Sequence, residues 1–392
     1  MVSNWRDVYL GAAATATTLF VFYELKQVFF DPRYAASKPP APKVNGLPDL
    51  IGNTPIVRIN SLSKLTGCDI YAKLELTNIG GSSKDRVAYE LIRAAEASGK
   101  LLPGRGDVIF EGTSGSTGIS LTTVGRALGY RVHIVLQDDT SPEKITLLES
   151  LGATVEKVKP ASIVDPDQFV NLAEKRAIEL TSDPSTPAMG LFANQFENDN
   201  NWKVHYNHTA PEIFSQMNGK LDAFVAGAGT GGTISGIAKY LRERIPQLGV
   251  YLADPQGSGF YNRVNFGVLY DKVEKEGTRR RHQVDTVVEG IGLNRLTHNF
   301  LVGEELIDGA VRVSDKQALM MAKFLTVNDG YFWGSASAIA AVGCVKVAQQ
   351  LGPGKKLLMI ATDSGARHLS KFWKMAAKED SEITLEEILN EK

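Results

Sequence analysis

Short apolar segments that alternate with helical repeats constrain the fold of this chain more than any other feature. Five such runs, rich in Val, Ile, Leu and Phe, have the length of strands. Strands that alternate with helices are typical of a mostly parallel sheet covered on both faces. The pattern extends from about residue 50 to 375 and predicts an α/β fold. The runs are VIF (108–110), VHIVL (132–136), AFVA (223–226), VYLA (250–253) and LLMIA (357–361).

Three of these runs are followed by small loops of glycines and hydroxyl side chains. The loops are EGTSGSTG (111–118), GAGTGGT (227–233) and TDSGAR (362–367), and a helical segment follows each. Ligands of open α/β sheets bind beyond the carboxyl ends of the strands, so we expect all three loops at a ligand site. A glycine-rich loop that leads into a helix binds anions through its backbone N–H groups. With the hydroxyls of Thr230 and Thr233, GAGTGGT is therefore a predicted phosphate site.

A fourth loop, GGSSKDR (80–86), places Lys84 at the start of an amphipathic helix. From Asp85 onward the apolar positions recur at helical spacing, and Gly99 ends the run. A cation in the first turn faces the positive end of the helix dipole, which favours the neutral amine. A partly neutral lysine acts as a nucleophile or a proton shuttle. Considered alone, the loop is explained more simply by an exposed lysine that Asp85 balances.

A phosphate site and such a lysine together match the needs of pyridoxal phosphate. This cofactor requires a lysine for its Schiff base, a phosphate site and a partner for its ring nitrogen. A dinucleotide is the alternative, because Gly227, Gly229 and Gly232 form GxGxxG and Asp254 ends the next strand. That pattern leaves GGSSKDR and EGTSGSTG unexplained. A serine hydrolase fits less well, because neither hydroxyl loop completes GxSxG.

Composition excludes several other classes of protein. The chain has 392 residues, enough for about two to three domains, and its net charge of −1 gives no indication of a nucleic-acid partner. Its two cysteines, Cys68 and Cys344, are too few for a disulfide scaffold and favour a reducing compartment. The six histidines show no metal-ligand spacing, so no metal site is predicted.

The first 44 residues differ from the rest of the chain. The segment VYLGAAATATTLFVFY (8–23) carries no charge, and as a helix it would span about 24 Å, a little less than a bilayer core. We interpret it as a signal anchor, because a secretory signal lacks its cleavage site here and a matrix presequence would be rich in arginine. Basic residues after the segment predict a catalytic part that faces the cytosol. SKPPAPK (37–43) is a predicted semi-rigid tether.

Seven motifs then occur in an order that resembles one family of enzymes. Together they resemble the cysteine synthase and cystathionine β-synthase family of fold-type II pyridoxal-phosphate enzymes, most of all fungal-type membrane-anchored cysteine synthases. The motifs are IGNTPIVRIN (51–60), GGSSKDR (80–86), TSGSTG (113–118), QFEN with a following HY (195–206), GTGGT (229–233), GIG (290–292) and DSG (363–365).

The resemblance implies a tryptophan synthase β-like fold, with two doubly wound subdomains and the cofactor in the cleft. We expect a smaller subdomain at about 78–198 and a larger one at about 45–77 plus 199–375. Residues 1–44 would form the anchor and tether, and 376–392 an acidic tail in which TLEEILNEK forms a short helix. Family members are usually dimeric, so a homodimer is expected.

The resemblance also assigns roles to residues. Lys84 would carry the cofactor as a Schiff base and then remove the substrate α-proton. The other expected cofactor-binding residues are Ser116, Gly229, Thr230, Gly231, Gly232 and Thr233, with Ser364 at the pyridine nitrogen. The expected substrate-binding residues are Thr113, Ser114, Gly115, Thr117 and Gln195 at the carboxylate, with Gly290 near the amine.

These roles predict a β-replacement reaction. A neutral hydroxyl such as Ser364 does not keep the pyridine protonated, which favours loss of a β-leaving group over transamination. We therefore expect a transferase of cysteine biosynthesis, which makes L-cysteine from O-acetylserine and sulfide through an aminoacrylate. Cystathionine synthesis and cysteine desulfhydration on the same site remain alternatives, and a dinucleotide-dependent dehydrogenase is a distant one.

Ser116 departs from the family pattern, which usually reads TSGNTG. Serine is shorter than asparagine and offers one hydroxyl in place of an amide. The departure predicts reduced synthase activity or a changed substrate, and it keeps open a pyridoxal-phosphate-binding protein with weak or lost catalysis. For the anchor we expect the mitochondrial outer membrane, with the endoplasmic reticulum as the alternative.

Overall fold

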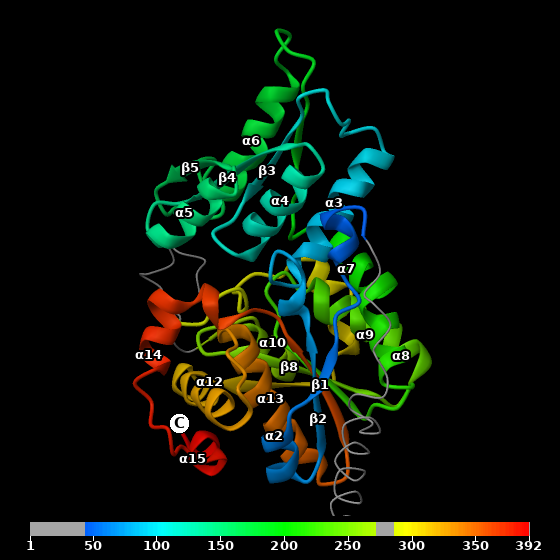
Figure 1. Cartoon of the computed structure of the whole chain (residues 1–392), viewed down its shortest axis with the longest axis vertical. Coiled ribbons are helices and arrows are strands. Elements are labelled where there is room, and N and C mark those ends of the chain that lie inside the picture. Colours follow the sequence, from blue (N-terminus) through cyan, green and yellow to red (C-terminus); the bar gives the residue numbers. More distant parts are fainter. Residues whose placement is uncertain (1–43, 272–285, 392) are drawn as a thin grey trace, which may run out of the picture. The chain divides into compact units, whose positions relative to one another are not determined.

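The computed structural model describes residues 44–271 and 286–391. Contacts divide the chain into residues 1–45 and Gly46–Lys392, and all helices and strands below belong to the second unit (Figure 1). The predicted signal anchor at 8–23 and its tether at 37–43 lie outside the described residues. Within the two described ranges, every helix is too short or too polar to span a lipid bilayer.

Ten strands and fourteen α-helices make up the described part of Gly46–Lys392. The strands are β1 (Ile56–Arg58), β2 (Asp69–Leu74), β3 (Val108–Gly112), β4 (Arg131–Gln137), β5 (Thr154–Val158), β6 (Gly190–Phe192), β7 (Ala223–Ala226), β8 (Gly249–Pro255), β9 (Gly309–Val313) and β10 (Lys356–Ala361). The helices are α2 (Asn60–Thr66), α3 (Lys84–Ala97), α4 (Ser116–Ala127), α5 (Pro142–Ser150), α6 (Phe169–Thr181), α7 (Asn200–Val204), α8 (Ala210–Gln216), α9 (Gly232–Arg244), α10 (Phe260–Phe266), α11 (His298–Leu301), α12 (Asp315–Asp329), α13 (Ser335–Leu351), α14 (Lys374–Ala376) and α15 (Leu385–Asn390). All five predicted strands are confirmed.

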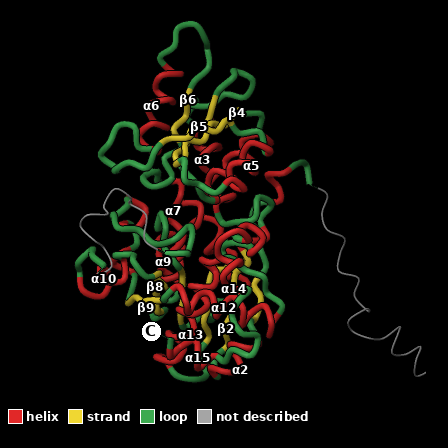
Figure 2. Tube along the Cα trace, turned by 90° about the vertical axis from the view of Figure 1, so that its left-hand side faces the viewer, coloured by secondary structure: helices red, strands yellow, loops and turns green. Residues whose placement is uncertain are grey.

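The strands form two separate sheets, which Figure 2 shows as two groups. The larger sheet has the order β1-β2-β10-β7-β8-β9, and only the β1–β2 pair is antiparallel. The last strand therefore lies in the middle, where Met359 pairs with Ala72 of β2 and with Val225 of β7. Because β7 and β10 are adjacent and parallel, their carboxyl ends bring GAGTGGT and TDSGAR to the same edge.

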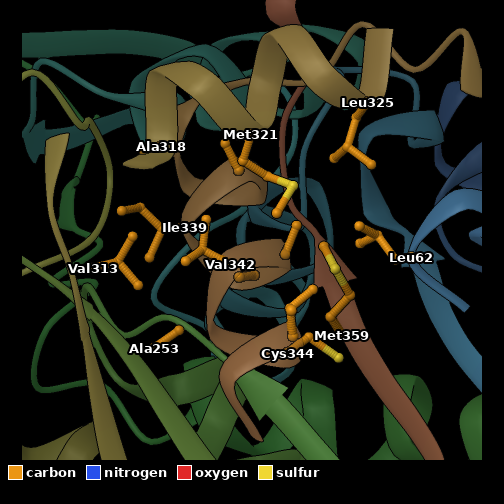
Figure 3. Close-up of a cluster of buried hydrophobic side chains, with 14 of the residues drawn as sticks. Leu62, Ala253, Val313, Ala318, Met321, Leu325, Ile339, Val342, Cys344 and Met359 are labelled. Atoms are coloured by element: carbon orange, nitrogen blue, oxygen red, sulfur yellow. The ribbon is translucent and has the colours of Figure 1, made fainter. Parts of the chain in front are cut away.

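Helices cover both faces of the larger sheet. On one face α13 packs on β7, β8, β9 and β10, and α12 packs on α13. Figure 3 shows Met321 and Leu325 of α12 above Ile339 and Val342 of α13. Residues of α8, α9 and α10 cover the other face with a second apolar cluster. Small residues, mostly alanines, dominate α13, which allows this helix to lie between α12 and the sheet with thirteen buried residues.

The smaller sheet has the order β5-β4-β3-β6, and all its neighbours are parallel. Helices α3, α4 and α5 contribute to an apolar cluster on one face, and α6 packs on the other. The predicted loop EGTSGSTG runs from the last two residues of β3 into the first turn of α4, so this third ligand segment belongs to a different sheet from the other two.

Two further expectations are met near the ends of the core. The predicted helix in TLEEILNEK is α15, and a capping box of Thr384 and Glu387 starts it. Its Leu385 and Ile388 are buried in the core cluster that also holds α12 and α13. Cys68 and Cys344 are both buried and unpaired, as expected for a chain without a disulfide framework.

Candidate active site

An enclosed pocket brings Lys84 together with two of the predicted loops. Its lining includes Lys84 with Gly229, Thr230, Gly231, Thr233 and Gly290. Thr362, at the carboxyl end of β10, closes another side. Residues from four distant parts of the sequence therefore meet at Lys84. This lysine is the first residue of α3, as the helical spacing predicts.

The surroundings of Lys84 favour its neutral amine. The side chain is half-buried. Burial lowers the pKa of Lys84, while the carboxylates of Glu75 and Asp363 oppose the shift. The direction agrees with the prediction from the helix dipole, although burial is the larger cause. A lysine with a lowered pKa is suited to nucleophilic attack and proton transfer.

Asp85 holds the loop before Lys84 in place. Its carboxylate accepts hydrogen bonds from the backbone N–H of Gly80, at 2.6 Å, and from Ser120 Oγ of α4, at 2.6 Å. The simpler interpretation, an exposed lysine balanced by Asp85, does not hold, because Lys84 is half-buried and Asp85 is buried with other partners. The Asp85 side chain instead fastens GGSSKDR to the helix that follows EGTSGSTG.

Arg86 fastens the same loop to the larger sheet through a buried charge network. Its Nε lies 2.8 Å from Glu75 Oε2, and its Nη1 lies 2.7 Å from Glu212 Oε1. Glu212 also pairs with Lys73 at 2.6 Å, and Thr54 Oγ1 donates to Glu75 at 2.7 Å. Lys73, Glu75 and Arg86 are all buried. The KDR part of the motif therefore positions Lys84 from both sides.

Backbone packing explains the glycines of GAGTGGT. Gly231 has φ +86°, and a Cβ atom there would lie 2.5 Å from Phe300 Cα. A Cβ atom on Gly229 would lie 2.3 Å from the carbonyl oxygen of Gly290. Neither position accepts a side chain, so the backbone N–H groups stay open toward the start of α9.

Two hydroxyls complete this loop, each held by a buried polar side chain. Asn201 Nδ2 donates to Thr230 Oγ1 at 2.9 Å, and His205 Nε2 lies 3.1 Å from Thr233 Oγ1. Burial, together with the positive charges of Lys84 and Arg86, holds the pKa of His205 well below its usual range, so the ring is neutral.

The pocket fits the phosphate cofactor that the sequence predicts. Open N–H groups, two hydroxyls and the positive end of α9 provide an anion site. Ser83 Oγ also lines the pocket, and among the described residues this buried hydroxyl has no hydrogen-bond partner. A buried polar atom without a partner is expected where a ligand binds.

The predicted carboxylate-binding residues lie together beside this pocket but do not line it. Thr117 Oγ1 donates to Gln195 Oε1, and the N–H of Gly115 donates to Thr113 Oγ1 at 3.1 Å. Ser114, Gly115 and Ser116 are half-buried at the start of α4. The two regions are linked by Asn201, whose Nδ2 also donates to the carbonyl oxygen of Gln195 at 2.7 Å.

Glu111 is a buried acid behind the carboxylate loop. The backbone N–H of Gln195 donates to its carboxylate at 3.3 Å, and Gln195 Nε2 donates to it at 3.4 Å. Burial raises the pKa of Glu111 to about 8, against these hydrogen bonds. Glu111 therefore positions the amide that was predicted to help bind the substrate.

The structure brings the DSG motif beside the lysine loop. Asp363 forms a β-bridge with Ser82, and Ser364 forms one with Trp333. Ser364 Oγ accepts the N–H of Ala366 at 3.3 Å and does not line the pocket, whereas Thr362 does. The pyridine-nitrogen role of Ser364 remains a prediction.

Several supporting residues were missed by the sequence analysis. Asn201 and His205 lie in the QFEN-to-HY segment, so the motif was noticed although no role was given to either. Glu111 opens EGTSGSTG, which the sequence pattern predicts to be a loop, whereas the structure places Glu111 within β3. The dinucleotide fingerprint is not assembled, because Asp254 is buried, accepts the N–H of Tyr261 at 2.7 Å and does not line the pocket.

A chain of charged groups connects the smaller sheet to the GIG loop. Lys144 of α5 lies 2.7 Å from Glu289 Oε2, directly before Gly290. Glu289 also lies 3.3 Å from His368 Nδ1, and His368 Nε2 lies 2.7 Å from Asp363. Burial disfavours the charged form of His368, but Asp363 and Glu289 outweigh it and raise the pKa of His368 to about 9.

This network predicts a pH dependence of stability. The pKa of His368 is about 6.5 when unfolded and about 9 when folded, so its ion pairs stabilise the fold fully below pH 6.5. The contribution, roughly 3 kcal/mol, is lost as the pH rises through 9. We expect the difference in unfolding free energy between wild type and His368→Gln, from urea denaturation, to shrink between pH 6.5 and 9.5. A difference that stays constant over this range would contradict the assignment.

Comparison with known proteins identifies similar chains. Residues 47–363 match the family described as "Pyridoxal-phosphate dependent enzyme". The chain is 62% identical over 353 residues to the "Putative mitochondrial cysteine synthase" of Saccharomyces cerevisiae, covering 90% of this chain and 89% of that one. It is 55% identical to "Cysteine synthase 2" of Emericella nidulans, covering 90% and 85%. The solved O-acetylserine dependent cystathionine beta-synthase from Helicobacter pylori superposes with a TM-score of 0.68 at 32% identity, covering 84% and 98%.

Proposed function

Because the chain belongs to the family of pyridoxal-phosphate dependent enzymes, we propose that it makes L-cysteine from O-acetyl-L-serine and sulfide, with release of acetate. One observation carries the proposal: a half-buried lysine with a lowered pKa shares a pocket with a glycine-rich anion loop. The similarity to fungal cysteine synthases over nine-tenths of the chain supports the choice of reaction.

The residues of the pocket hold the cofactor. The N–H groups of Gly229–Thr233, with the hydroxyls of Thr230 and Thr233, would bind its phosphate, and Lys84 Nζ would hold its aldehyde carbon. Ser364 is proposed for the ring nitrogen and Ser116 for the phenolic oxygen of the ring. When bound, pyridoxal phosphate withdraws electrons from the α-carbon of an amino acid.

The remaining residues bind the substrate and move its proton. Thr113, Ser114, Gly115, Thr117 and Gln195 are proposed to bind the carboxylate, and Gly290 borders the amine. Lys84 Nζ would take the α-proton of the substrate, because burial favours the neutral amine, which can accept a proton. Acetate would leave from the β-carbon with the electrons of its C–O bond, hydrosulfide would add there, and Lys84 would return the proton to the α-carbon.

The decisive experiment measures product formation by the purified protein loaded with pyridoxal phosphate. O-acetyl-L-serine and sulfide should give L-cysteine and acetate in equal amounts, quantified by chromatography. Parallel reactions with homocysteine in place of sulfide, and with cysteine alone, test the cystathionine and desulfhydrase alternatives. Cofactor bound without any product would instead identify a protein that has lost catalysis, for which Ser116 is the proposed cause.

We also propose the domain division and assembly that the resemblance implies. The smaller sheet lies within 108–192, and all strands of the larger sheet lie outside 78–198, which supports subdomains at about 78–198 and at 45–77 plus 199–375. A homodimer is proposed by similarity to the family, and sedimentation equilibrium tests it.

Membrane attachment through residues 1–44 is a further proposal. The uncharged segment 8–23 supports it, and the name of the Saccharomyces cerevisiae relative supports a mitochondrial location, most simply the outer membrane. A fluorescent reporter fused after residue 44 should sediment with mitochondria and resist carbonate extraction. A matched fusion of residues 24–44 should stay in the supernatant. If the longer fusion is also released by carbonate, the anchor interpretation fails.

A further inference from the structure

Arg367 reaches from one sheet to the loop of the other. It ends the TDSGAR loop after β10, yet its Nη1 lies 3.4 Å from Ser116 Oγ at the start of α4. A Cβ atom on Gly81 would lie 3.0 Å from Arg367 Nη2 and 3.2 Å from its Cζ. The guanidinium group therefore lies between the backbone of the lysine loop at Gly81 and Ser116, the first residue of α4.

No carboxylate pairs with this guanidinium among the described residues. Its one hydrogen bond there is the long contact with Ser116. Burial lowers the pKa of Arg367, and the carboxylates of Asp85 and Asp363 oppose this shift. Asp85 accepts from Gly80 and Ser120, and Asp363 pairs with His368, so both carboxylates already have partners.

The start of α4 adds a second positive field next to the charge of Arg367. The first turn of the twelve-residue helix has N–H groups without intrahelical partners, and no side chain caps it. The positive end of a helix dipole repels a cation, so Arg367 and the helix both favour a bound anion between them. Half-burial strengthens this preference, because water screens the two positive fields less there.

We propose that Arg367 binds the α-carboxylate of the amino-acid substrate, together with the backbone of residues 113–117. The inference rests on the proposed function and specifies its substrate class: amino acids with a free carboxylate. In an α-amino acid the carboxylate carbon is two bonds from the amine nitrogen. A substrate whose amine lies beside Lys84 therefore has its carboxylate within a few ångströms, on the side where Gly81 leaves room for the guanidinium. A planar guanidinium suits a carboxylate better than an ammonium does.

The test compares substrates with and without that carboxylate. For O-acetyl-L-serine, we expect Arg367→Met to lower kcat/KM for cysteine formation about 30-fold, the effect of one charge-assisted hydrogen bond. For O-acetyl-L-serinamide, which carries no carboxylate, the same variant should change kcat/KM less than about twofold. Arg367→Lys should recover part of the loss. Arg126→Met, at the exposed far end of α4, is the matched control and should behave like wild type.

A second readout does not depend on cysteine formation. L-serine and L-serinamide are titrated into the cofactor-loaded protein, and the change in cofactor absorbance gives their dissociation constants. We expect Arg367→Met to raise the dissociation constant of L-serine and to leave that of L-serinamide unchanged. An equal loss of affinity for L-serine and L-serinamide, or no loss for either, would overturn the proposal. An equal loss would indicate that Arg367 has a structural role. If wild type forms no cysteine but Arg367→Met still weakens only L-serine, the proposed function fails and the carboxylate site stands.

Discussion

Lys84→Ala is expected to reduce cysteine formation by at least about 1000-fold, since both the covalent anchor of the cofactor and the proton acceptor are removed. The substitution should also abolish the visible absorbance that a lysine-bound cofactor gives. Lys84 makes no ion pair among the described residues, and its side chain points into the pocket, so its loss leaves the packing of α3 unchanged. Rate measurements and absorbance spectra check the two effects on the same samples.

Lys100→Ala provides the matched control for this prediction. Lys100 is exposed just beyond the other end of α3, so its removal deletes the same functional group without touching the pocket. Wild-type rates and spectra are expected. A Lys84→Ala protein that keeps its visible band, or that still forms cysteine within tenfold of the wild-type rate, would sink the assignment of Lys84.

The second large effect concerns stability. Arg86→Met is expected to lower the free energy of unfolding by about 3–5 kcal/mol, because it leaves the Glu75 carboxylate buried without its counterion. Glu212 also loses a partner. Burial raises the pKa of Glu212, but Arg86 and Lys73 together outweigh burial and hold this pKa at about 2. Urea denaturation followed by far-ultraviolet circular dichroism measures the loss.

Arg93→Met tests whether burial causes the loss. Arg93 lies on the same helix and pairs with Glu96 at 2.6 Å, but half of its side chain is exposed. Solvent screens this pair, so its removal should change the unfolding free energy by less than about 0.5 kcal/mol. Similar losses for the two variants would mean that the buried network contributes no more than an ordinary surface pair.

Much of the fold followed from local patterns in the sequence. Apolar runs located β3, β4, β7, β8 and β10, and helical spacing located α3 and α9, whose apolar faces are buried. The division into two sheets did not follow from these patterns. Strand order depends on long-range pairing, and nothing in VIF or AFVA states which neighbour each will have.

The candidate site shows the same limit. Lys84 and GAGTGGT could be predicted from the sequence, because their residue types are distinctive and each lies at the start of a predicted helix. Asn201 and His205 act by holding hydroxyls that lie about thirty positions away in the sequence. Arg367 lies 251 positions from Ser116, and neither residue indicates the other. Contacts of this kind exist only once the two sheets are assembled, so residue spacing cannot reveal them.

The central place of β10 has a consequence for synthesis on the ribosome. Strand β2 is synthesised early, but its partner β10 follows almost three hundred residues later. Until then, the edges of β2 and β7 that pair with β10 have backbone groups without hydrogen-bond partners. At about 5–20 residues per second, that interval lasts roughly a quarter of a minute to a minute. The smaller sheet, which is continuous between β3 and β6, is complete long before then. A nascent chain is therefore expected to carry a complete smaller sheet beside an unfinished larger one, and we expect the unpaired edges of β2 and β7 to need protection from aggregation during synthesis.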